Sequence, residues 1–327
     1  MRLLAVLLLS VAVAGAWSPA GAAEREPGLD SAYLVGLDIH TPDGEVVHVS
    51  VPQRLADSTW LLGETDRGWV VGARCGYYLV SADATTRIGD RLCRGIDHNE
   101  LLSDDGLHIV RTQRDLSLAT VVAIDLDGNT SPETAIHANA ASVDDAKAGL
   151  AYVTGLRGLF EVDLVTGEST RTMTQKTSLI DLESDTLFVR GRKRHDTWGP
   201  TSLAEPGPPR WQRIFTATDV SPNGTYVLGD LLSNGARRIQ VFRSSDGRRV
   251  RGLPYPSKKY AYDAYFYDVI GWDSDRSVVM VKEFGTRRAI VRCPVPKGRC
   301  ARVTPRTDLA VSLPTSTMGA HRYDDLD

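Results

Sequence analysis

The sequence lacks the short motifs that mark the common classes of enzyme. It contains no GxSxG nucleophile elbow, no HExxH helix and no glycine-rich loop followed by a helix that could hold a phosphate. The SxDxGxTW box of sialidases is also absent. The seven histidines are scattered, and a scattered histidine is more often packed or exposed than a ligand. We therefore predict no catalytic residue, no metal and no cofactor.

A strong net charge is absent as well. The chain of 327 residues holds 38 Lys and Arg and 41 Asp and Glu, which leaves a formal charge of −3 at pH 7. A near-neutral balance does not favour a nucleic acid as the partner. CxxC pairs are also missing, which excludes the usual zinc knuckle for the four cysteines.

The long apolar run of this chain lies at the N-terminus, where Arg2 precedes Leu3–Ala16 and a small-residue site at Ala20-Gly21-Ala22. With about 14 residues the run is shorter than the roughly 20 that a membrane-spanning helix needs. The pattern predicts a secretory signal peptide over residues 1–22, cleaved near Ala22. No cysteine at this site offers a lipid anchor, and the C-terminus has no hydrophobic tail. We expect a freely secreted, extracytoplasmic protein with no membrane span in its mature form.

Sustained helical periodicity is missing after the signal peptide. Short β-branched or aromatic runs recur instead between Asp-Gly, Asn-Gly and Thr-Gly turns. They repeat as a unit of four strands, a to d, and the clearest copy is "ATDVSPNGTYVLGDL" followed by "RIQVFRSSDGRRVRGLP". Six copies have second strands spaced 36–53 residues apart, which is the range of propeller blades.

Each unit is one antiparallel sheet that cannot bury both faces alone, so we predict an all-β fold whose units stack in a ring, a β-propeller. Near the N-terminus "LVGLDIHT" and "EVVHVSVP" match strands c and d of a further unit, and "DLAVSLPT" from Asp308 is its expected inner strand. We favour seven four-stranded blades, with the ring closed by pairing N- and C-terminal strands in one blade. Six blades and a loose N-terminal hairpin are the alternative, and "AEPGPPR" leaves open whether the fourth unit keeps all four strands. The propeller is expected to span residues 23–318 and a C-terminal tail residues 319–327.

The units resemble those of WD-repeat-like and TolB-type β-propellers. "VSPNGTYVLG" followed by "RIQVFRSSDGRRV" is similar to their pattern of Ser-Pro-Asp-Gly, a strand, and an Asp before a turn glycine. The resemblance covers nearly the whole mature chain, although no unit carries the Trp-Asp dipeptide or the structural histidine of true WD repeats. It implies a fold and no activity, because one fold hosts many functions.

The four cysteines fit this arrangement as two disulfides of an exported protein. Cys293 and Cys300 flank "PVPKGR" in strands c and d of the sixth unit, so they can face each other. Cys75 ends strand b and Cys93 ends strand d of the first unit, so both lie at one rim. We predict Cys75–Cys93 and Cys293–Cys300 as stabilising bonds with no redox role.

The segment "DLDGNTSPE" places Asp125, Asp127 and Asn129 in the alternation of a calcium loop. An EF-hand needs a glutamate at the twelfth position, which here is Ile136. A turn between strands c and d is the preferred interpretation, because Asp and Gly favour tight turns.

The propeller model sorts the charges by face, because the a–b and c–d turns share one face of the ring and the b–c and d–a connections share the other. We expect the first face to be acidic, through Glu64, Asp66, Asp83, Asp104, Asp105, Asp127, Asp144, Asp145, Glu168 and Asp185. We expect the second face to be basic, through Arg74, Arg91, Arg94, Arg111, Arg114, Arg157 and Lys176.

Two long segments belong to the expected basic face. "RGRKRHDTW" joins strands b and c of the fourth unit, and "PYPSKKYAYDAYFYD" joins the fifth and sixth units. Basic groups among aromatic rings suit anions by charge and sugars by ring stacking. The predicted ligand-binding residues are Arg192, Lys193, Arg194, Trp198, Lys258, Lys259, Tyr260, Tyr262 and Tyr265.

Two functions are compatible with these features. The favoured one is a secreted, monomeric, non-catalytic module that recognises an anionic cell-wall polymer, a glycan or another secreted protein through the basic face. The alternative is an extracellular glycoside hydrolase or lyase with carboxylates at the central channel. Its candidate residues are Asp181, Glu183, Asp219 and Asp273.

Overall fold

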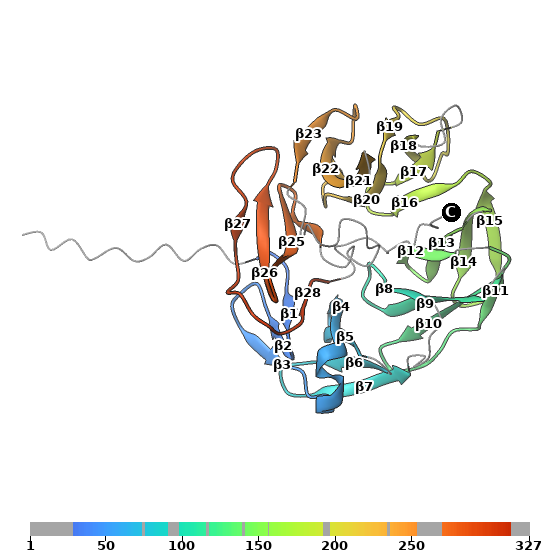
Figure 1. Cartoon of the computed structure of the whole chain (residues 1–327). Helices are drawn as coiled ribbons and strands as arrows, with labels where there is room; N and C mark the ends of the chain where they lie inside the picture. The colour runs from blue at the N-terminus through green and yellow to red at the C-terminus, as the bar shows by residue number, and fades with distance from the viewer. Residues whose placement is uncertain are drawn as a thin grey trace, which may run out of the picture.

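The computed structural model describes residues 29–73, 76–90, 98–115, 118–138, 141–155, 157–191, 197–233, 236–253 and 270–314. Their strands form seven four-stranded antiparallel sheets that follow one another around a central axis (Figure 1). The protein is a seven-bladed β-propeller, so the predicted fold class is confirmed. The predicted signal peptide over residues 1–22 and the tail over residues 319–327 lie outside the described residues. Within the described ranges, no helix is long and apolar enough to cross a membrane.

The first three blades each run from an inner to an outer strand in chain order. Blade 1 contains β4 (Trp60–Thr65), β5 (Gly68–Ala73), β6 (Gly76–Val80) and β7 (Thr85–Asp90), and a short 3-10 helix, Gln53–Ser58, precedes it. Blade 2 contains β8 (His98–Leu102), β9 (His108–Asp115), β10 (Leu118–Asp125) and β11 (Thr134–Ile136). Blade 3 contains β12 (Ser142–Lys147), β13 (Leu150–Gly155), β14 (Gly158–Asp163) and β15 (Ser169–Met173).

The next three blades continue this order. Blade 4 contains β16 (Thr177–Asp181), β17 (Thr186–Arg190), β18 (Thr197–Ser202) and β19 (Arg213–Ile214). Blade 5 contains β20 (Thr216–Val220), β21 (Tyr226–Ser233), β22 (Ala236–Arg243) and β23 (Arg249–Gly252). Blade 6 contains β24 (Ile270–Ser274), β25 (Ser277–Phe284), β26 (Arg287–Pro294) and β27 (Ala301–Arg302).

The closing blade takes strands from both ends of the described chain. Its order is β28 (Val311–Ser312), β1 (Tyr33–Val35), β2 (Asp38–His40) and β3 (Val46–His48). Leu34 lies opposite Ser312, so the predicted pairing of the terminal segments is confirmed. One detail was wrong, because "LVGLDIHT" is not a single strand but contains the end of β1, a turn and β2. The turn depends on Gly36, whose φ of 62° is one that other residues rarely adopt.

A buried aspartate of blade 6 joins that blade to the first described residues. The carboxylate of Asp273 accepts the N–H groups of Asp30 (2.8 Å) and Ser31 (3.3 Å) and forms an ion pair with Arg292. A buried charge is tolerated where it is both paired and hydrogen-bonded, as it is here. The arrangement fastens the N-terminal segment to the sixth blade and so helps to close the ring.

The tight turns between inner strands share a hydrogen-bond pattern. In "SPNG" of blade 5, Ser221 Oγ accepts the N–H of Tyr226 at 2.9 Å and Asn223 Oδ1 accepts the N–H of Thr225 at 3.0 Å. In "SDDG" of blade 2, Ser103 Oγ accepts the N–H of His108 at 3.0 Å, and Asp105 Oδ1 accepts the N–H of Leu107 at 3.1 Å. These side chains satisfy backbone donors that the ladder leaves free, which explains the recurring Ser-x-Asn/Asp-Gly sequence.

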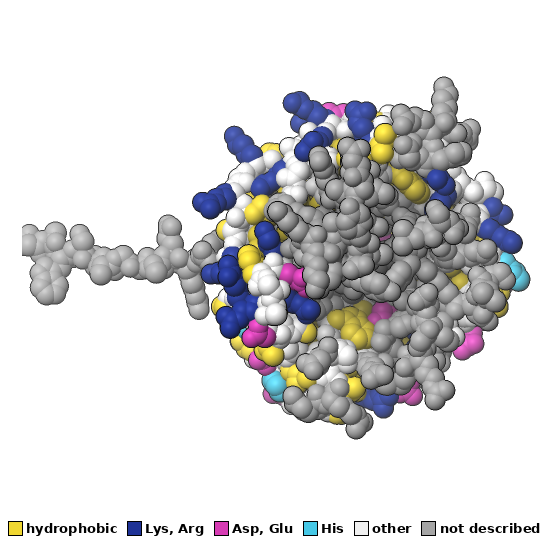
Figure 2. All heavy atoms as spheres, in the orientation of Figure 1, with side chains coloured by type: hydrophobic (Ala, Val, Ile, Leu, Met, Phe, Trp, Pro, Cys, Tyr) yellow, Lys and Arg dark blue, Asp and Glu magenta, His cyan; other side chains and the backbone are white. Residues whose placement is uncertain are grey.

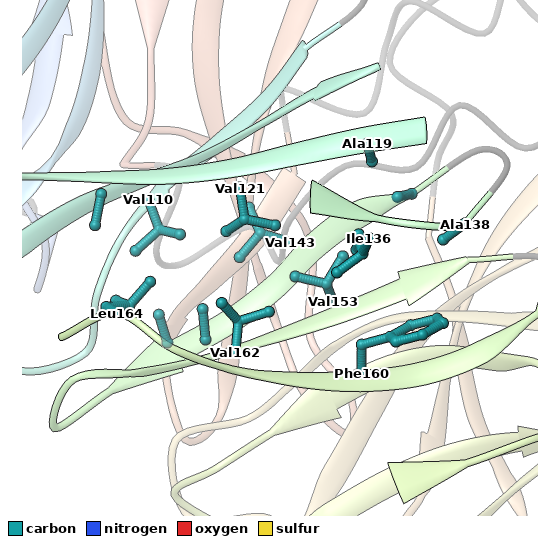
Figure 3. Packing of buried hydrophobic residues seen from close by; sticks show 14 of the residues in the cluster. Val110, Ala119, Val121, Ile136, Ala138, Val143, Val153, Phe160, Val162 and Leu164 are labelled. Atoms are coloured by element: carbon teal, nitrogen blue, oxygen red, sulfur yellow. The ribbon is translucent and has the colours of Figure 1, made fainter. Parts of the chain in front are cut away.

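The hydrophobic core of the described residues is divided into clusters, one between each pair of neighbouring blades. Figure 3 shows the cluster between blades 2 and 3, where Val121 and Val143 come from facing sheets. Because every blade is covered on both faces, an inner strand such as β12 is buried over nearly its full length, whereas the outer strand β15 is largely exposed. Apolar burial between sheets therefore holds the ring together.

Blade 4 keeps all four strands, which resolves the point that its prolines left open. Its strand β18 contains a Gly-Pro pair, which the sequence alone suggested was loop. Gly199 is needed in β18, because a Cβ there would lie 1.7 Å from the backbone oxygen of Trp211. Pro200 is paired with Phe188 of β17 and still accepts the N–H of Arg210 at 2.9 Å.

One of the two predicted disulfides lies within the described residues. Cys293 and Cys300 are bonded across the c–d turn of blade 6, with Cα atoms 4.2 Å apart, so this prediction is confirmed. Cys75 and Cys93 lie outside the described residues, and their pairing stays a prediction.

Candidate functional site

The predicted ligand-binding residues fall mostly outside the described part of the chain. Arg192, Lys193, Arg194, Lys258, Lys259, Tyr260, Tyr262 and Tyr265 all belong to the undescribed segments. Trp198 is described, and its expected place in a loop was wrong. Its side chain is 7% exposed in β18 and packs with Phe188 and Phe215 between blades 4 and 5. A ring in that position stabilises the core and is not presented to a ligand.

The predicted division of charge by face holds for one part of the ring and fails for another. The a–b and c–d turns of blades 1 to 3 carry acidic residues such as Asp66, Asp105 and Asp127, as expected. The c–d turns of blades 5 and 6 instead carry Arg248, Lys297 and Arg299. The charge therefore changes around the circumference, and a sorting by face alone does not capture it.

The two sides of the ring carry opposite charge. Residues 30–185, which form most of the closing blade, blades 1 to 3 and the inner half of blade 4, hold 25 Asp and Glu against 12 Lys and Arg. Residues 210–306, which include blades 5 and 6, hold 19 Lys and Arg against eight Asp and Glu. Figure 2 shows dark blue side chains gathered along the side of the ring that blades 5 and 6 occupy. A protein with a small net charge thus presents one strongly cationic side.

Basic residues on this side are concentrated on three consecutive outer strands and the turns beside them. We call this surface the basic rim and define it by Arg213, Arg248, Arg249, Arg251, Lys297, Arg299 and Arg302. All are exposed except Arg251, which is half-buried. The outer strands of blades 1 to 3 carry only Arg87 on β7 and Arg171 on β15, and the c–d turns of these blades, residues 81–84, 126–133 and 164–168, contain no Lys or Arg. The rim is thus a local feature and not a general property of outer strands.

Arginines on both sides of the ring form ion pairs, and Arg243 of blade 5 lies 3.3 Å from Asp246. Arg67 forms an ion pair with Asp127 at 2.8 Å, and Arg87 forms one with Asp90. Within the described residues, Arg248, Arg249, Lys297 and Arg299 have no carboxylate within ion-pair distance. Cations without internal partners remain free to bind an external anion.

Contacts between blades position the rim. Arg213 of β19 donates from Nε to the backbone oxygen of Gly247 in the next blade, at 3.1 Å. Arg251 of β23 repeats this contact one blade further, donating to the backbone oxygens of Pro294 and Gly298, the latter at 2.7 Å. The c–d turn of each following blade is therefore fastened to the outer strand of the preceding one.

Toward the axis, carboxylates gather near the inner strands of blades 2 to 5, and this group thus extends from the acidic side into blade 5. Burial, with a smaller effect from Asp104, raises the pKa of Asp145 to about 8. Partial burial and the neighbouring Glu183 raise the pKa of Asp104 to about 6. Burial also raises the pKa of Asp181, and burial together with Asp181 raises the pKa of Asp219 well above its usual range. The structure thus brings together three of the four carboxylates predicted for the channel.

These carboxylates have contacts that serve the ring itself. Asp145 of blade 3 accepts the N–H of Leu182 in blade 4 at 2.9 Å. Asp219 of blade 5 is held by a backbone N–H of blade 6, and the fourth candidate, Asp273, makes the corresponding link to the closing blade. Carboxylates on successive inner strands therefore link neighbouring blades, and Asp273 is paired with Arg292 apart from the acidic group.

The acidic groups do not form a metal site within the described ranges, where no three His, Cys, Asp or Glu side chains have ligating geometry. The suspected calcium loop is a c–d turn between β10 and β11. Asp125 accepts the N–H groups of Asp127 (2.9 Å) and Asn129 (2.8 Å), together with the side-chain amide of Asn129. These bonds account for the Asp-rich sequence without a cation.

Comparison with known proteins finds similarity to this chain in its fold only. No family model matches the sequence, and no curated protein matches it. Among solved structures, Kluyveromyces marxianus Hsv2 is similar with a TM-score of 0.52 and 11% identity, over 84% of this chain and 99% of that one. An uncharacterized protein of Listeria monocytogenes gives a TM-score of 0.51 and 9% identity, over 81% of this chain and 88% of that one.

TolB from Acinetobacter baumannii is also similar, with a TM-score of 0.46 and 9% identity, over 86% of this chain and 76% of that one. The seven blades of the structure confirm the predicted resemblance to β-propellers at the level of the fold. At these identities the likeness says nothing about a ligand or an activity.

Proposed function

We propose that this protein is a secreted, non-catalytic binding module that holds an anionic polymer or glycan on the basic side of its propeller. The observation that carries the proposal is the basic rim, a surface whose exposed cations lack internal ion-pair partners. A rigid propeller presents such a surface without the entropy cost of ordering a flexible chain.

The chemistry of the rim suits a repeating anion. Arginine dominates the rim, and a guanidinium group can donate two parallel hydrogen bonds to phosphate, sulfate or carboxylate oxygens. A polymer can contact several such groups at once, so modest contacts add to a useful affinity. The acidic side of the ring would repel the same polymer and so limit where it binds.

The carboxylates near the axis favour this proposal over a hydrolase. Asp145, Asp219 and Asp273 each accept a backbone N–H from the following blade, so a structural requirement accounts for their burial. A glycoside hydrolase needs two carboxylates flanking a bound sugar at a defined separation. A carboxylate that is hydrogen-bonded to the next blade is not available to act as a catalytic acid, base or nucleophile.

The proposal is tested by measuring the binding of mature protein to immobilised long-chain polyphosphate and heparin across a salt series. We expect binding that weakens steadily with salt, because cations on the protein displace counterions from the polymer. Reversing Arg248, Arg249, Lys297 and Arg299 to Glu should reduce affinity at least tenfold. The matched control reverses Arg157 and Arg171, two exposed cations of the acidic side, and should keep the affinity.

Other partners are separate arms of the same experiment. Binding to anionic vesicles or to double-stranded DNA with neither polymer retained would replace the proposed partner. No binding to any polyanion, or equal binding by the rim variant, would refute the proposal. Cleavage of a glycan by the mature protein would support the hydrolase instead, and a secretion assay of the full chain tests the predicted export.

A further inference from the structure

The junction between blades 5 and 6 differs from the rest of the basic rim because its cations lie on a turn held from two sides. The turn joins β26 to β27 and carries Lys297 and Arg299 at its exposed tip. The Cys293–Cys300 disulfide closes its base, and Cys293 is fully buried. The covalent bond limits the conformations of a short cationic segment.

The second restraint comes from the preceding blade. Arg251 of β23 donates to the backbone oxygens of Pro294 and Gly298, and its Nη2 also lies 3.4 Å from the Sγ atom of Cys300. Burial lowers the pKa of Arg251. Because its guanidinium group donates to backbone oxygens of the turn, Arg251 holds the turn in place and is less available to a ligand.

A simpler explanation exists for part of this charge. Outer strands often carry charged residues that prevent edge-to-edge pairing with another sheet. That explanation covers Arg249 on β23, but the same protection would be needed on β11, which carries no Lys or Arg. It does not cover Lys297 and Arg299, which lie in a turn and not on a strand edge.

From these contacts we propose that the junction of blades 5 and 6 is a preorganised oxyanion site. Lys297 and Arg299 contact phosphate or sulfate groups of the polymer, and Arg249 of the adjoining outer strand extends the contact. Arg251 and the Cys293–Cys300 disulfide are positioning elements. The inference rests on the proposed function and assigns it to a defined set of residues.

The test compares neutralised variants by affinity and by the slope of log affinity against log salt, with polyphosphate and heparin as separate probes. K297Q/R299Q should weaken binding at least tenfold and reduce the slope by about 1.4–1.8, because each of the two lost phosphate contacts removes roughly 0.7–0.9 from it. R157Q/R171Q is the matched control, and it should leave both the affinity and the slope unchanged. The ratio of the affinities for polyphosphate and heparin distinguishes a phosphate-bearing from a sulfate-bearing ligand.

Positioning by Arg251 predicts a different pattern. R251M should weaken binding several-fold while leaving the salt slope unchanged, since its charge is not one of the ligand contacts. R251K, which can still donate to a turn carbonyl, should recover part of the affinity. C293A/C300A should behave like R251M, and a double variant avoids reductants, which would also act on Cys75 and Cys93.

The outcomes separate the two proposals. If polymers bind but K297Q/R299Q behaves as the control does, the junction site is wrong while the binding function stands. If R251M lowers the slope by about one, Arg251 is a direct contact and its positioning role is wrong. If neither polymer binds wild-type protein, the proposed function itself fails. Thermal melts of each variant, all expected to remain folded, show that the losses do not arise from unfolding.

Discussion

The acidic and basic sides of this propeller use the same four-stranded blade for different purposes. On the acidic side, carboxylates such as Asp145 are buried near the inner strands and their pKa values are raised. On the basic side, cations such as Lys297 and Arg299 lie at the outer strands and turns, exposed and without ion-pair partners among the described residues. Charge near the axis is used to join blades, and charge on the circumference is available to a partner.

The difference teaches where to look for function in a symmetric fold. Every blade needs links to its neighbours, so a polar group repeated near the axis has a structural explanation first. A feature confined to a few adjacent blades is not something that every blade of the ring requires. Asymmetry among the blades is therefore the stronger functional signal, as the contrast between β23 and β11 illustrates.

The largest expected effect comes from removing the aspartate that the basic side depends on. Asp273→Ala removes the closer of two carboxylates beside the largely buried Arg292, the other being Asp30 at 3.9 Å, and takes away the acceptor of the Asp30 and Ser31 N–H groups. We expect a loss of about 3 kcal/mol in the free energy of unfolding, measured by urea denaturation, because the largely buried guanidinium loses its closer carboxylate while the exposed Asp30 stays 3.9 Å away. Asp273→Asn keeps an acceptor and should lose less. Equal losses would show that the charge of this residue, and not its hydrogen-bond acceptance, is what stabilises the fold.

The stability of the protein should depend on pH through the carboxylates near the inner strands. Because the folded-state pKa values of Asp104, Asp145, Asp181 and Asp219 are raised, the folded state binds more protons than the unfolded state above the ordinary aspartate pKa. Their contribution to stability is fully present below that pKa and is lost as the pH rises to about 8. We expect the free energy of unfolding to fall by about 2 kcal/mol between mildly acidic and mildly alkaline buffer. Urea denaturation at each pH measures this change.

Other carboxylates limit this trend at low pH. Hydrogen bonds from backbone and side-chain donors lower the pKa values of Asp105, Asp125 and Asp163, so the stability that they contribute is lost as the pH falls through those lowered values. The combined prediction is a stability maximum in mildly acidic solution. A maximum at alkaline pH would contradict the burial of the acidic group.

A smaller effect of opposite sign to that of Asp273→Ala is expected on the acidic side. Asp104→Asn removes a negative charge that raises the pKa of Asp145 and has no side-chain hydrogen bond among those described. At alkaline pH we expect stability to increase by about 0.5–1 kcal/mol, because like-charge repulsion is relieved. At mildly acidic pH, where Asp145 is already protonated, the change should vanish. Stabilisation that does not vary with pH would contradict this cause.

The smallest effect should come from the exposed ion pairs of the acidic side. Arg67→Gln breaks the pair with Asp127, in which both side chains are well exposed. Exposed pairs contribute about 1 kcal/mol or less, so thermal melts should move little. Polyphosphate binding should not change, because Arg67 lies far from the basic rim along the ring. A large loss of polymer affinity would remove the distinction between the two sides.

Much of the architecture was predictable because it depends on local chemistry. Turn residues such as those of "SPNG" and "SDDG" are required by hydrogen bonds over a few residues, and alternating apolar runs mark strands that must be covered. The composite blade was also predictable, since two unmatched strands at one end of the chain need an inner partner. The boundary at Gly36 was missed because β1 and β2 are both very short.

Parts of the site were not predictable in the same way. Trp198 was assigned to a loop because it ends the basic segment "RGRKRHDTW" between strands b and c, whereas β18 begins at Thr197, and the close approach of Trp211 explains the glycine that follows. The basic rim was overlooked because charges were sorted by turn type. Counting charges along the chain, unit by unit, would have found it, as residues 210–306 show.

The sequence by itself determined a repeated four-stranded unit and the pairing of Cys293 with Cys300, and it favoured seven such units over six, because turns, strand patterns and short hairpins are read from neighbouring residues. Only the tertiary structure decided which charges are used between blades and which remain exposed. Asp145 and Leu182, or Arg251 and Gly298, are distant in sequence, and their contacts exist only once the blades are packed side by side. The burial, ion pairs and pKa of a side chain depend on neighbours that folding brings close, and the sequence around the residue does not show which neighbours these are.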